Sequence, residues 1–243
     1  MIYGLISDIH GNLEALEAVL AELAGVDAFL CLGDIVGYGA DPGQCVDRVR
    51  DLPDLTCVAG NHDLAAIGRY DLSWFNPLAR AAIQWTDENL SSAQKAYLSS
   101  LQETARVADA FLVHGSYPET MDYITAPQDA RRCFDATTDA LVLVGHTHIG
   151  EHYRARGGSL LPVQTSLAAG GEVDLKPGLR YIINPGAVGQ PRDGKAAASF
   201  AIWRVEERVV EARRAAYDVE RAQDKMRAAG LPPYLAERLA RGR

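Results

Sequence analysis

The sequence contains no long apolar run. Its hydrophobic stretches fall well short of the roughly 18 to 20 consecutive apolar residues that a membrane-spanning helix requires. The start of the chain also does not look like a secretory signal, because residues 1–7 lead directly to the charged Asp8 without a basic segment or a small-residue cleavage site. We therefore expect no membrane segment and a cytoplasmic location.

Cysteine is scarce, and its spacing is not that of a metal knuckle. The 243 residues include only four cysteines, Cys31, Cys45, Cys57 and Cys133, with no pair close in sequence. Cys31 and Cys57 lie within apolar segments, where a free cysteine behaves as a small core residue. We expect neither a disulfide nor a zinc site made of cysteines.

Basic charge is also in deficit. The chain has 24 Lys and Arg against 32 Asp and Glu, a formal net charge of -8. Proteins that hold nucleic acid through its backbone need a basic face. Nucleic acid is therefore not an expected partner, and a bound phosphate would have to be attracted by a local positive charge.

The chain is long and apolar enough for one domain with a sizeable core, which we expect to span residues 1–243. Its first 60 residues alternate in the strand and helix patterns of an α/β sheet. The expected strands are 2–6, 28–32 and 55–59. A helix with leucines at helical spacing follows the N-cap residue Asn12, and a second helix runs from Asp41-Pro42 to about Arg50.

Residues 64–104 show no strand pattern, and we interpret them as a helical insertion. Asn76-Pro77 marks one helix start, and Ser91 with Gln94 forms the capping box of another. Three aromatic residues in this segment, Trp74, Phe75 and Trp85, are expected to form the small core that docks the insertion on the sheet. The alternative is that the insertion forms a lid over the site.

The second half of the chain is expected to be mainly β. Strand patterns recur at 110–114 and 141–145, with a short helix near 128–135 between them. From residue 160 onward, segments that include 179–184 and a hairpin of 198–205 and 209–215 are expected to complete a second sheet. The tail, about 218–243, is expected to be helical.

Each strand of the α/β part is followed by a loop that carries metal-binding side chains. The loops are Asp8-Ile9-His10, Gly33-Asp34, Gly60-Asn61-His62-Asp63, His114-Gly115 and Gly145-His146-Thr147-His148. Because the carboxyl ends of strands in an α/β sheet meet at one crevice, these side chains should converge. Five of the six histidines lie in these loops, and His152, outside them, is expected to be a surface or strand residue.

Each of these loops alone would more often be a turn or a helix cap than a ligand. Five of them in order after apolar strands predict a metal site instead. Imidazole nitrogen with carboxylate and amide oxygen suits Mn²⁺, Fe²⁺ or Zn²⁺, and the absence of cysteine ligands favours an open catalytic site over a closed structural one.

The ordered set DIH, GD, GNHD, HG and GHTH resembles the calcineurin-like metallophosphoesterase superfamily, over residues 1 to about 190. Residues 184–193 (NPGAVGQPRD) are similar to a segment of its small bacterial and archaeal phosphodiesterase-like branch. The resemblance implies an α/β fold in which a two-sheet sandwich is flanked by helices and carries the site at the strand carboxyl ends.

The resemblance also implies a site with two divalent metal ions, expected to be Mn²⁺, with Fe or Zn as alternatives. The implied ligands of the first ion are Asp8, His10, Asp34 and His148, and those of the second are Asp34, Asn61, His114 and His146. Asp34 would bridge the ions at the roughly 3.5 to 4 Å that suits two-metal catalysis. His62 would donate a proton to the leaving group, oriented by Asp34 or Asp63.

The expected activity is hydrolysis of a small phosphodiester by in-line attack of a metal-bridging hydroxide. Phosphomonoesterase, phosphoprotein phosphatase and dinucleoside polyphosphate hydrolase are alternatives, because the same metal core serves all of them. A non-catalytic scaffold would be expected to have lost ligands, and none is lost here. The oligomeric state stays open.

Two further residues are candidate substrate contacts. Arg192 offers a fork of donors to a phosphate, and the alternative is an ion pair with Asp193 or another acid. Tyr38 lies between Gly37 and Gly39 and either lines the cleft or covers an edge of the sheet.

Overall fold

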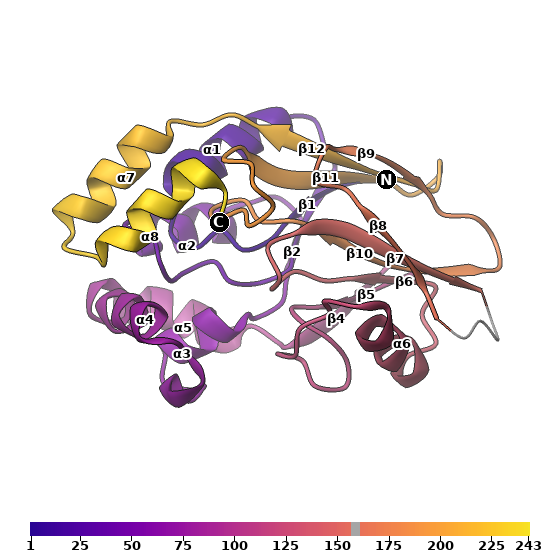
Figure 1. Ribbon diagram of the computed structural model, residues 1–243, viewed down its shortest axis with the longest axis horizontal. Helices are drawn as coiled ribbons and strands as arrows, with labels where there is room; N and C mark the ends of the chain where they lie inside the picture. Colours follow the sequence, from indigo (N-terminus) through magenta and orange to yellow (C-terminus); the bar gives the residue numbers. More distant parts are fainter. Residues whose placement is uncertain (157–160) are drawn as a thin grey trace.

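The computed structural model describes residues 1–156 and 161–243, so residue 160, where the β-rich half was expected to begin, lies outside the described part. Two mixed sheets of six strands pack on each other and carry helices on their outer sides (Figure 1). The predicted α/β fold of two sheets flanked by helices is confirmed. Within the described residues, no helix is long and apolar enough to cross a membrane.

The first sheet has the strand order β3-β2-β1-β11-β12-β9. Its strands are β1 (Ile2–Ile6), β2 (Ala28–Cys31), β3 (Leu55–Cys57), β9 (Gly171–Asp174), β11 (Ala198–Arg204) and β12 (Val209–Ala215). Strands β1, β2 and β3 are parallel, and β11 pairs antiparallel with β1. The three parallel strands therefore end at the same edge, where three of the predicted ligand loops begin.

The second sheet has the strand order β4-β5-β6-β10-β7-β8. Its strands are β4 (Thr104–Val107), β5 (Ala110–Val113), β6 (Leu141–Leu143), β7 (Gly150–Arg156), β8 (Val163–Ser166) and β10 (Leu179–Pro185). Strand β6 lies parallel to both β5 and β10. The ends of β5 and β6 supply the other two predicted ligand loops.

The expectation that the chain after residue 160 completes the second sheet is wrong in part. The hairpin of β11 and β12 joins the first sheet beside β1, and the second sheet draws its strands from 104–185. Alternation of apolar residues determines which face of a strand is buried, but not which strand lies next to it. Strand β7 was not predicted because charged residues such as Arg154 occupy its exposed face opposite the buried Tyr153.

Helices cover both sheets. They are α1 (Leu13–Glu22), α2 (Pro42–Arg50), α3 (Asn61–Ala66), α4 (Pro77–Asn89), α5 (Ser92–Ser100), α6 (Pro127–Ala136), α7 (Val219–Ala228) and α8 (Pro233–Glu237), with 3₁₀ turns η1 (Leu72–Trp74) and η2 (Arg238–Arg241). The predicted caps form: Asn12 Oδ1 accepts from the Ala15 NH at 3.1 Å, and Ser91 with Gln94 makes a reciprocal capping box. All four cysteines are free.

The core has three parts. One lies between the sheets and contains Leu30, Leu143 and Trp203, a second joins the first sheet to its helices, and a third packs α6 on the second sheet. Trp74 departs from its predicted role as a core residue, because its side chain is 79% exposed. Phe75 is buried, with only 8% exposed. The 3₁₀ turn that carries Trp74 directs this ring away from the core.

Candidate metal centre

The predicted ligand side chains converge, although they span 140 positions of sequence. The ligand atoms of two groups lie within 4.8 Å of one another: Asp8, His10, Asp34 and His148 in the first, and Asp34, His114 and His146 in the second. All six side chains are buried. Asp34 belongs to both groups, as the carboxylate of a two-metal site must.

Asp34 lies between the two groups. One of its carboxylate oxygens accepts a backbone hydrogen bond, and the other is directed into the site. Its Oδ1 accepts the backbone NH of His62 at 2.8 Å. Its Oδ2 lies 3.5 Å from His10 Nε2 and 3.3 Å from His114 Nε2, and it has no hydrogen-bond partner among the described residues. A buried carboxylate oxygen without a donor is costly unless a cation is bound beside it.

Three of the histidines are fixed in one tautomer by backbone carbonyls. The Nδ1–H groups of His10, His114 and His148 donate to the carbonyls of Val36, Leu32 and Gln190 at 3.0, 2.7 and 2.6 Å. With Nδ1 as the donor, Nε2 is the atom that carries the lone pair when the ring is neutral, which is the form in which imidazole binds a metal. Two such atoms, on His10 and His148, lie only 3.1 Å apart, a contact that a shared cation stabilises.

The remaining donors of the second group fit the same interpretation. His146 Nδ1 lies 3.1 Å from His114 Nε2. The buried Oδ1 of Asn61 has no hydrogen-bond partner among the described residues. Asp8 is held from the other side, because Ser7 Oγ donates to its Oδ2 at 2.7 Å and the His146 NH donates to the same carboxylate. These residues fit a pair of divalent ions, with mixed nitrogen and oxygen donors and no thiolate.

Backbone strain is concentrated at the site. Nine non-glycine residues in the described ranges have a positive φ, and five of them are predicted ligands. They are Asp8, His10, Asp34, His146 and His148, with φ between 50° and 67°. This left-handed conformation costs free energy for residues with a Cβ, and it persists only where the surroundings impose it. No sequence pattern signalled it.

Two glycines are required for close approaches in the site. A Cβ on Gly60 would collide with the Asp34 carboxylate, and a Cβ on Gly37, where φ is 91°, would collide with Nδ1 of His62. The glycine character of Gly37 follows from its contact with His62.

His62 lies at the site, but its predicted orientation by a carboxylate is wrong. Both oxygens of Asp63 accept backbone NH groups, from Val36 at 3.1 Å and Gly60 at 3.0 Å. Asp34 contacts the backbone of His62 and not its ring, whose Nδ1 has no partner among the described residues.

Aromatic packing holds the His62 ring instead. The ring centroid lies 4.5 Å from that of Tyr38, 4.7 Å from that of His10 and 5.0 Å from that of Phe75. The last contact is edge-to-face, at an interplanar angle of 80°. The ring therefore has a fixed position without a hydrogen-bonded carboxylate.

Burial and neighbouring charges separate the protonation states at the site. Burial alone would raise the pKa of Asp34, but the His114 and His62 side chains outweigh it and hold the pKa well below its usual value. Burial, and then the charge of Asp34, raises the pKa of Asp63 to about 7. Burial lowers the pKa of His62 to about 4, so its ring is neutral at neutral pH. Asp34 is thus the acid whose charge the site favours most.

Arg192 and Tyr38 lie next to each other at the edge of the first ligand group. Nη2 of Arg192 donates to Gln190 Oε1 at 3.1 Å and to the Tyr38 hydroxyl at 3.5 Å. The alternative ion pair with Asp193 does not form, because Asp193 pairs with Arg214, and both side chains are largely buried. The guanidinium carbon of Arg192 lies 5.9 Å from the ring centroid of Tyr38, and that ring lies 4.7 Å from the ring of the predicted ligand His10. Burial, and then the charge of Arg192, lowers the pKa of His148.

A cavity of about 420 Å³ opens beside His62. The residues that line it are Tyr38, Asn61, His62, Tyr70, Trp74, Phe75, Asn76, Ala79, Met121, Asp122, Tyr123 and His146. Tyr123 stacks on His146, with ring centroids 3.8 Å apart and an interplanar angle of 20°. Neither Tyr123 nor Tyr70 was predicted to belong to the site, because neither follows a strand.

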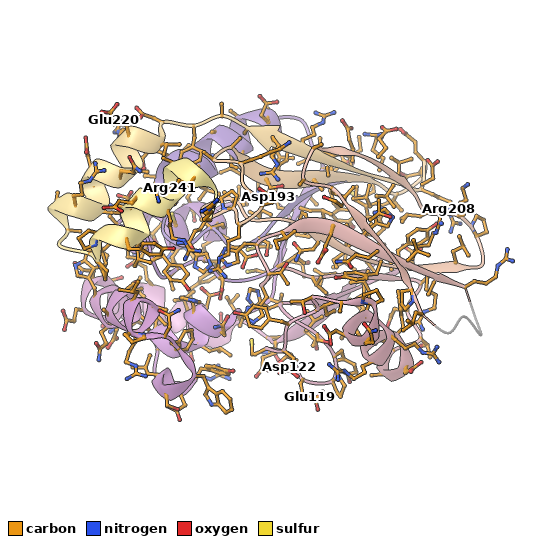
Figure 2. All side chains as sticks on the ribbon, viewed as in Figure 1. Glu119, Asp122, Asp193, Arg208, Glu220 and Arg241 are labelled. Atoms are coloured by element: carbon orange, nitrogen blue, oxygen red, sulfur yellow. The ribbon has the colours of Figure 1, made fainter. Side chains whose placement is uncertain are left out.

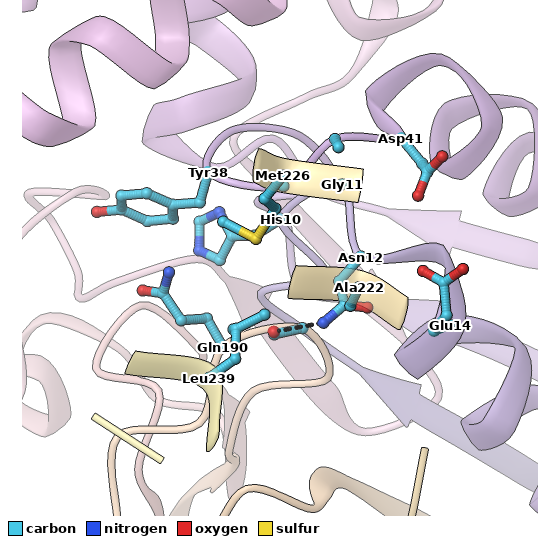
Figure 3. A pocket seen from close by; sticks show the side chains of 13 residues that line it. His10, Gly11, Asn12, Glu14, Tyr38, Asp41, Gln190, Ala222, Met226 and Leu239 are labelled. Atoms are coloured by element: carbon cyan, nitrogen blue, oxygen red, sulfur yellow. Dashed lines mark hydrogen bonds between the residues drawn. The ribbon is translucent and has the colours of Figure 1, made fainter. Parts of the chain in front are cut away.

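A much smaller cavity, of about 10 Å³, lies behind His10 (Figure 3). Its walls come from the ligand loops and from the C-terminal helices, which contribute Met226 and Leu239. Asn12 Nδ2 donates to the Gly189 carbonyl at 2.9 Å beside this cavity. The C-terminal tail therefore supports the ligand loops from behind.

Comparison with known proteins agrees with this geometry. A family model described as calcineurin-like phosphoesterase superfamily domain matches residues 1–208. An uncharacterized protein of Methanocaldococcus jannaschii is 38% identical over 247 residues, covering 98% of this chain and 97% of its own.

Solved structures agree in the same way. A metallophosphoesterase from Sphaerobacter thermophilus has 43% identity and a TM-score of 0.88, covering 100% of this chain and 99% of its own. A hypothetical protein from Pyrococcus horikoshii has 18% identity and a TM-score of 0.79, covering 100% and 98%. The second likeness concerns the fold alone.

Proposed function

The chain belongs to the calcineurin-like phosphoesterase superfamily and is a phosphoester hydrolase, and from this premise we propose that it is a dimetal phosphodiesterase. The observation that carries the proposal is the position of Asp34, whose partnerless Oδ2 lies between His10 and His114 of the two ligand groups. A single carboxylate shared by two such groups is the arrangement that two-metal hydrolysis requires.

We assign the ligands of each ion from these groups. Asp8, His10, Asp34 and His148 would hold one ion, and Asp34, His114, His146 and the amide oxygen of Asn61 would hold the other. Mn²⁺ is our first candidate, with Fe or Zn as alternatives, because the donor set mixes imidazole with oxygen. The bound ions would supply electrostatic stabilisation and an activated water for in-line displacement.

His62 is the residue that we propose donates a proton to the leaving oxygen. It lines the large cavity next to Asn61 but belongs to neither ligand group. Its ring is neutral in the free protein, since burial lowers its pKa to about 4. The negative charge of a bound phosphate would favour the protonated ring, and the departing alcohol would receive that proton.

The lining of the large cavity favours a diester with a neutral leaving alcohol over an ester whose leaving group carries a further charge. Among the described residues around it there is no Lys or Arg, and Asp122, labelled in Figure 2, adds an exposed carboxylate to the lining. A polyphosphate chain or a phosphorylated leaving group would therefore meet no cation there. A neutral alcohol on one side of a diester fits better.

Arg192 and Tyr38 are proposed contacts of the substrate phosphate. Arg192 has a buried Nε with no partner in the described part of the chain, and Nη2 is held by Gln190 and Tyr38. A guanidinium fixed in this way can donate to a phosphate oxygen without first ordering its side chain. The Tyr38 hydroxyl would act through the same hydrogen bond.

We also propose a cytoplasmic location and a small-molecule substrate. Four free cysteines accord with a reducing compartment, and the net charge of -8 disfavours a nucleic acid partner.

The proposal is tested by stripping the protein of metal and adding back Mn²⁺, Fe²⁺ or Zn²⁺. Hydrolysis of bis-(p-nitrophenyl) phosphate and of p-nitrophenyl phosphate is then compared. Metal-dependent turnover with preference for the diester supports the proposal. Preference for the monoester would favour the phosphatase alternative instead. A metal-loaded protein that hydrolyses neither ester would contradict the proposal.

A further inference from the structure

We infer that Trp74 and Tyr123 form a stacking site for a flat aromatic ring on the leaving group of the substrate. The inference deepens the proposed function and rests on it for the placement of the phosphate. The chemical class that fits is a phosphodiester in which the alcohol beside His62 is a neutral nucleoside.

The first observation is the exposure of Trp74 on a hydrogen-bonded turn. The indole is 79% exposed, although tryptophan is highly buried on average. The turn itself is fixed by hydrogen bonds: Asp71 Oδ1 accepts from the Ser73 NH at 2.8 Å, and Arg80 Nε donates to the Leu72 carbonyl at 3.2 Å. The ring is therefore presented to the cavity by a supported backbone without being needed for packing.

The second observation is a ring from a distant part of the chain that lies on the same cavity. Tyr123 is 51% exposed and stacks on His146, a proposed ligand of the second ion. One face of this tyrosine is covered by the histidine, and more than half of the side chain stays accessible. Two accessible aromatic side chains on one cavity suit a flat ring, which can stack on aromatic faces irrespective of its detailed structure.

The position of the cavity identifies which part of the substrate enters it. His62 and Phe75 line it together with Trp74, so it lies on the side of the proposed proton donor. A volume of about 420 Å³ leaves room for a group much larger than methanol. The occupant is thus the departing alcohol and not the part that stays on phosphorus.

Polar groups at the rim favour a nucleoside over a plain aryl group. The exposed carboxylate of Asp122 accepts hydrogen bonds, and no described residue donates to it. A nucleobase carries amino donors that an unsubstituted phenyl ring lacks. The absence of Lys and Arg among the described lining residues fits a neutral nucleoside and not a nucleotide.

The test compares two diesters that differ only in the base. One is the methyl diester of adenosine 5′-phosphate, and the other is the methyl diester of ribose 5-phosphate. Water adds to phosphorus and the bond to the 5′ oxygen breaks, so the expected products are adenosine and methyl phosphate. We expect kcat/KM of the Mn²⁺-loaded protein to be about tenfold to a hundredfold higher with the base.

Three variants make the test specific. In Trp74→Ala the ratio of the two kcat/KM values should fall toward one, and Trp74→Phe should keep most of it. Tyr234→Ala removes another exposed aromatic residue, 51% accessible as Tyr123 is, from helix α8 outside the cavity and should leave both rates unchanged. Any of three results would overturn the inference. They are equal kcat/KM values for the two diesters, a ratio in Trp74→Ala as large as that of the native protein, and formation of AMP and methanol as the products.

Failure of the proposed function can be distinguished from failure of this inference. If the Mn²⁺-loaded protein hydrolyses none of the diesters or chromogenic esters, the proposed activity is wrong. The stacking site is then tested by measuring ligand binding. The native protein should then bind AMP about tenfold more tightly than ribose 5-phosphate. Trp74→Ala should bind the two compounds with equal affinity. Equal dissociation constants would overturn the inference.

Discussion

The carboxylate of Asp34 contacts His62 through the backbone and not through the ring: Oδ1 accepts the His62 NH at 2.8 Å. The same carboxylate directs Oδ2 between the two ligand groups. Asp34 therefore links both proposed metal sites to the start of helix α3, where the proposed proton donor lies. Its removal and that of His62 should have different consequences.

Asp34→Asn should remove metal and activity together. The amide has one oxygen in place of two, so it cannot accept the His62 NH and also contact both ions. Because loss of outer-shell partners alone typically costs 10- to 100-fold, we expect activity to fall by more than about a hundredfold. Metal analysis by mass spectrometry should find fewer than two ions per chain, with the exposed Asp51→Asn as control. Full activity with two ions bound would refute the shared-ligand assignment.

His62→Asn should slow turnover while the ions stay bound. The side chain belongs to neither ligand group, and loss of a general acid typically costs about 10² to 10⁴ in rate. The loss should be large for a methyl leaving group and small for p-nitrophenol, which departs without protonation. A variant that loses its metals, or equal losses for both esters, would contradict the proton-donor role.

Much of this architecture could be predicted from local sequence. Apolar runs placed β1, β2, β5 and β6, and the loops after them identified the side chains that converge. Those predictions succeed because a strand and the loop that follows it are both encoded within a few residues. The caps at Asn12 and Ser91 were predictable for the same reason.

Features that depend on distant contacts were not predictable. The placement of β11 beside β1 joins segments nearly 200 residues apart, and nothing in either strand specifies the other. The exposure of Trp74 follows from the direction of a short 3₁₀ turn. The packing of His62 against Tyr38 and Phe75 likewise exists only in the folded chain.

Gly60→Ala tests whether close backbone approach is required at the centre. An added Cβ would collide with Oδ1 of Asp34, which accepts the His62 NH, and would shift the carboxylate that also carries the proposed bridging oxygen Oδ2. We expect loss of metal affinity and activity by at least about tenfold, by analogy with other changes in the surroundings of a metal ligand. Gly150→Ala is the matched control, because its Cβ would make ordinary contacts and its φ is not positive. Unchanged activity in Gly60→Ala would show that the loop accommodates the methyl group.

Arg192→Met should raise KM for a phosphate ester more than it lowers kcat. The variant keeps an apolar chain of similar length and removes the charge beside Tyr38 and the ligands. Loss of one charge-assisted hydrogen bond typically costs about 1.5 to 3 kcal/mol, roughly tenfold to a hundredfold in kcat/KM. Arg154→Met, on strand β7, serves as control. A fall in metal content would indicate that Arg192 supports the ligands instead.

Lys225→Met tests whether the ion pairs of the C-terminal helix α7 with Glu14 and Asp41 stabilise the fold. Nζ of Lys225 lies 2.6 Å from Glu14 Oε1 and 2.8 Å from Asp41 Oδ2, and these carboxylates are only 9% and 10% exposed. The variant leaves both acids nearly buried and without this cation, which should lower the free energy of unfolding by about 2 to 4 kcal/mol. Arg227→Met removes an exposed pair with Asp224 in the same helix and should cost less than about 1 kcal/mol.

The effect of Lys225 should also depend on pH in one direction. Burial would lower the pKa of Lys225, but its hydrogen bonds to Asp41 and Glu14 outweigh burial and raise the pKa above the ordinary 10.5. A raised pKa means that the folded chain holds the proton more tightly than the unfolded chain does. The stabilisation is thus fully present below 10.5 and is lost as the pH rises through the folded value. Urea unfolding of both proteins should give a constant difference at neutral pH that shrinks in strong alkali, and a difference that grows with pH would reject the ion pair as its source.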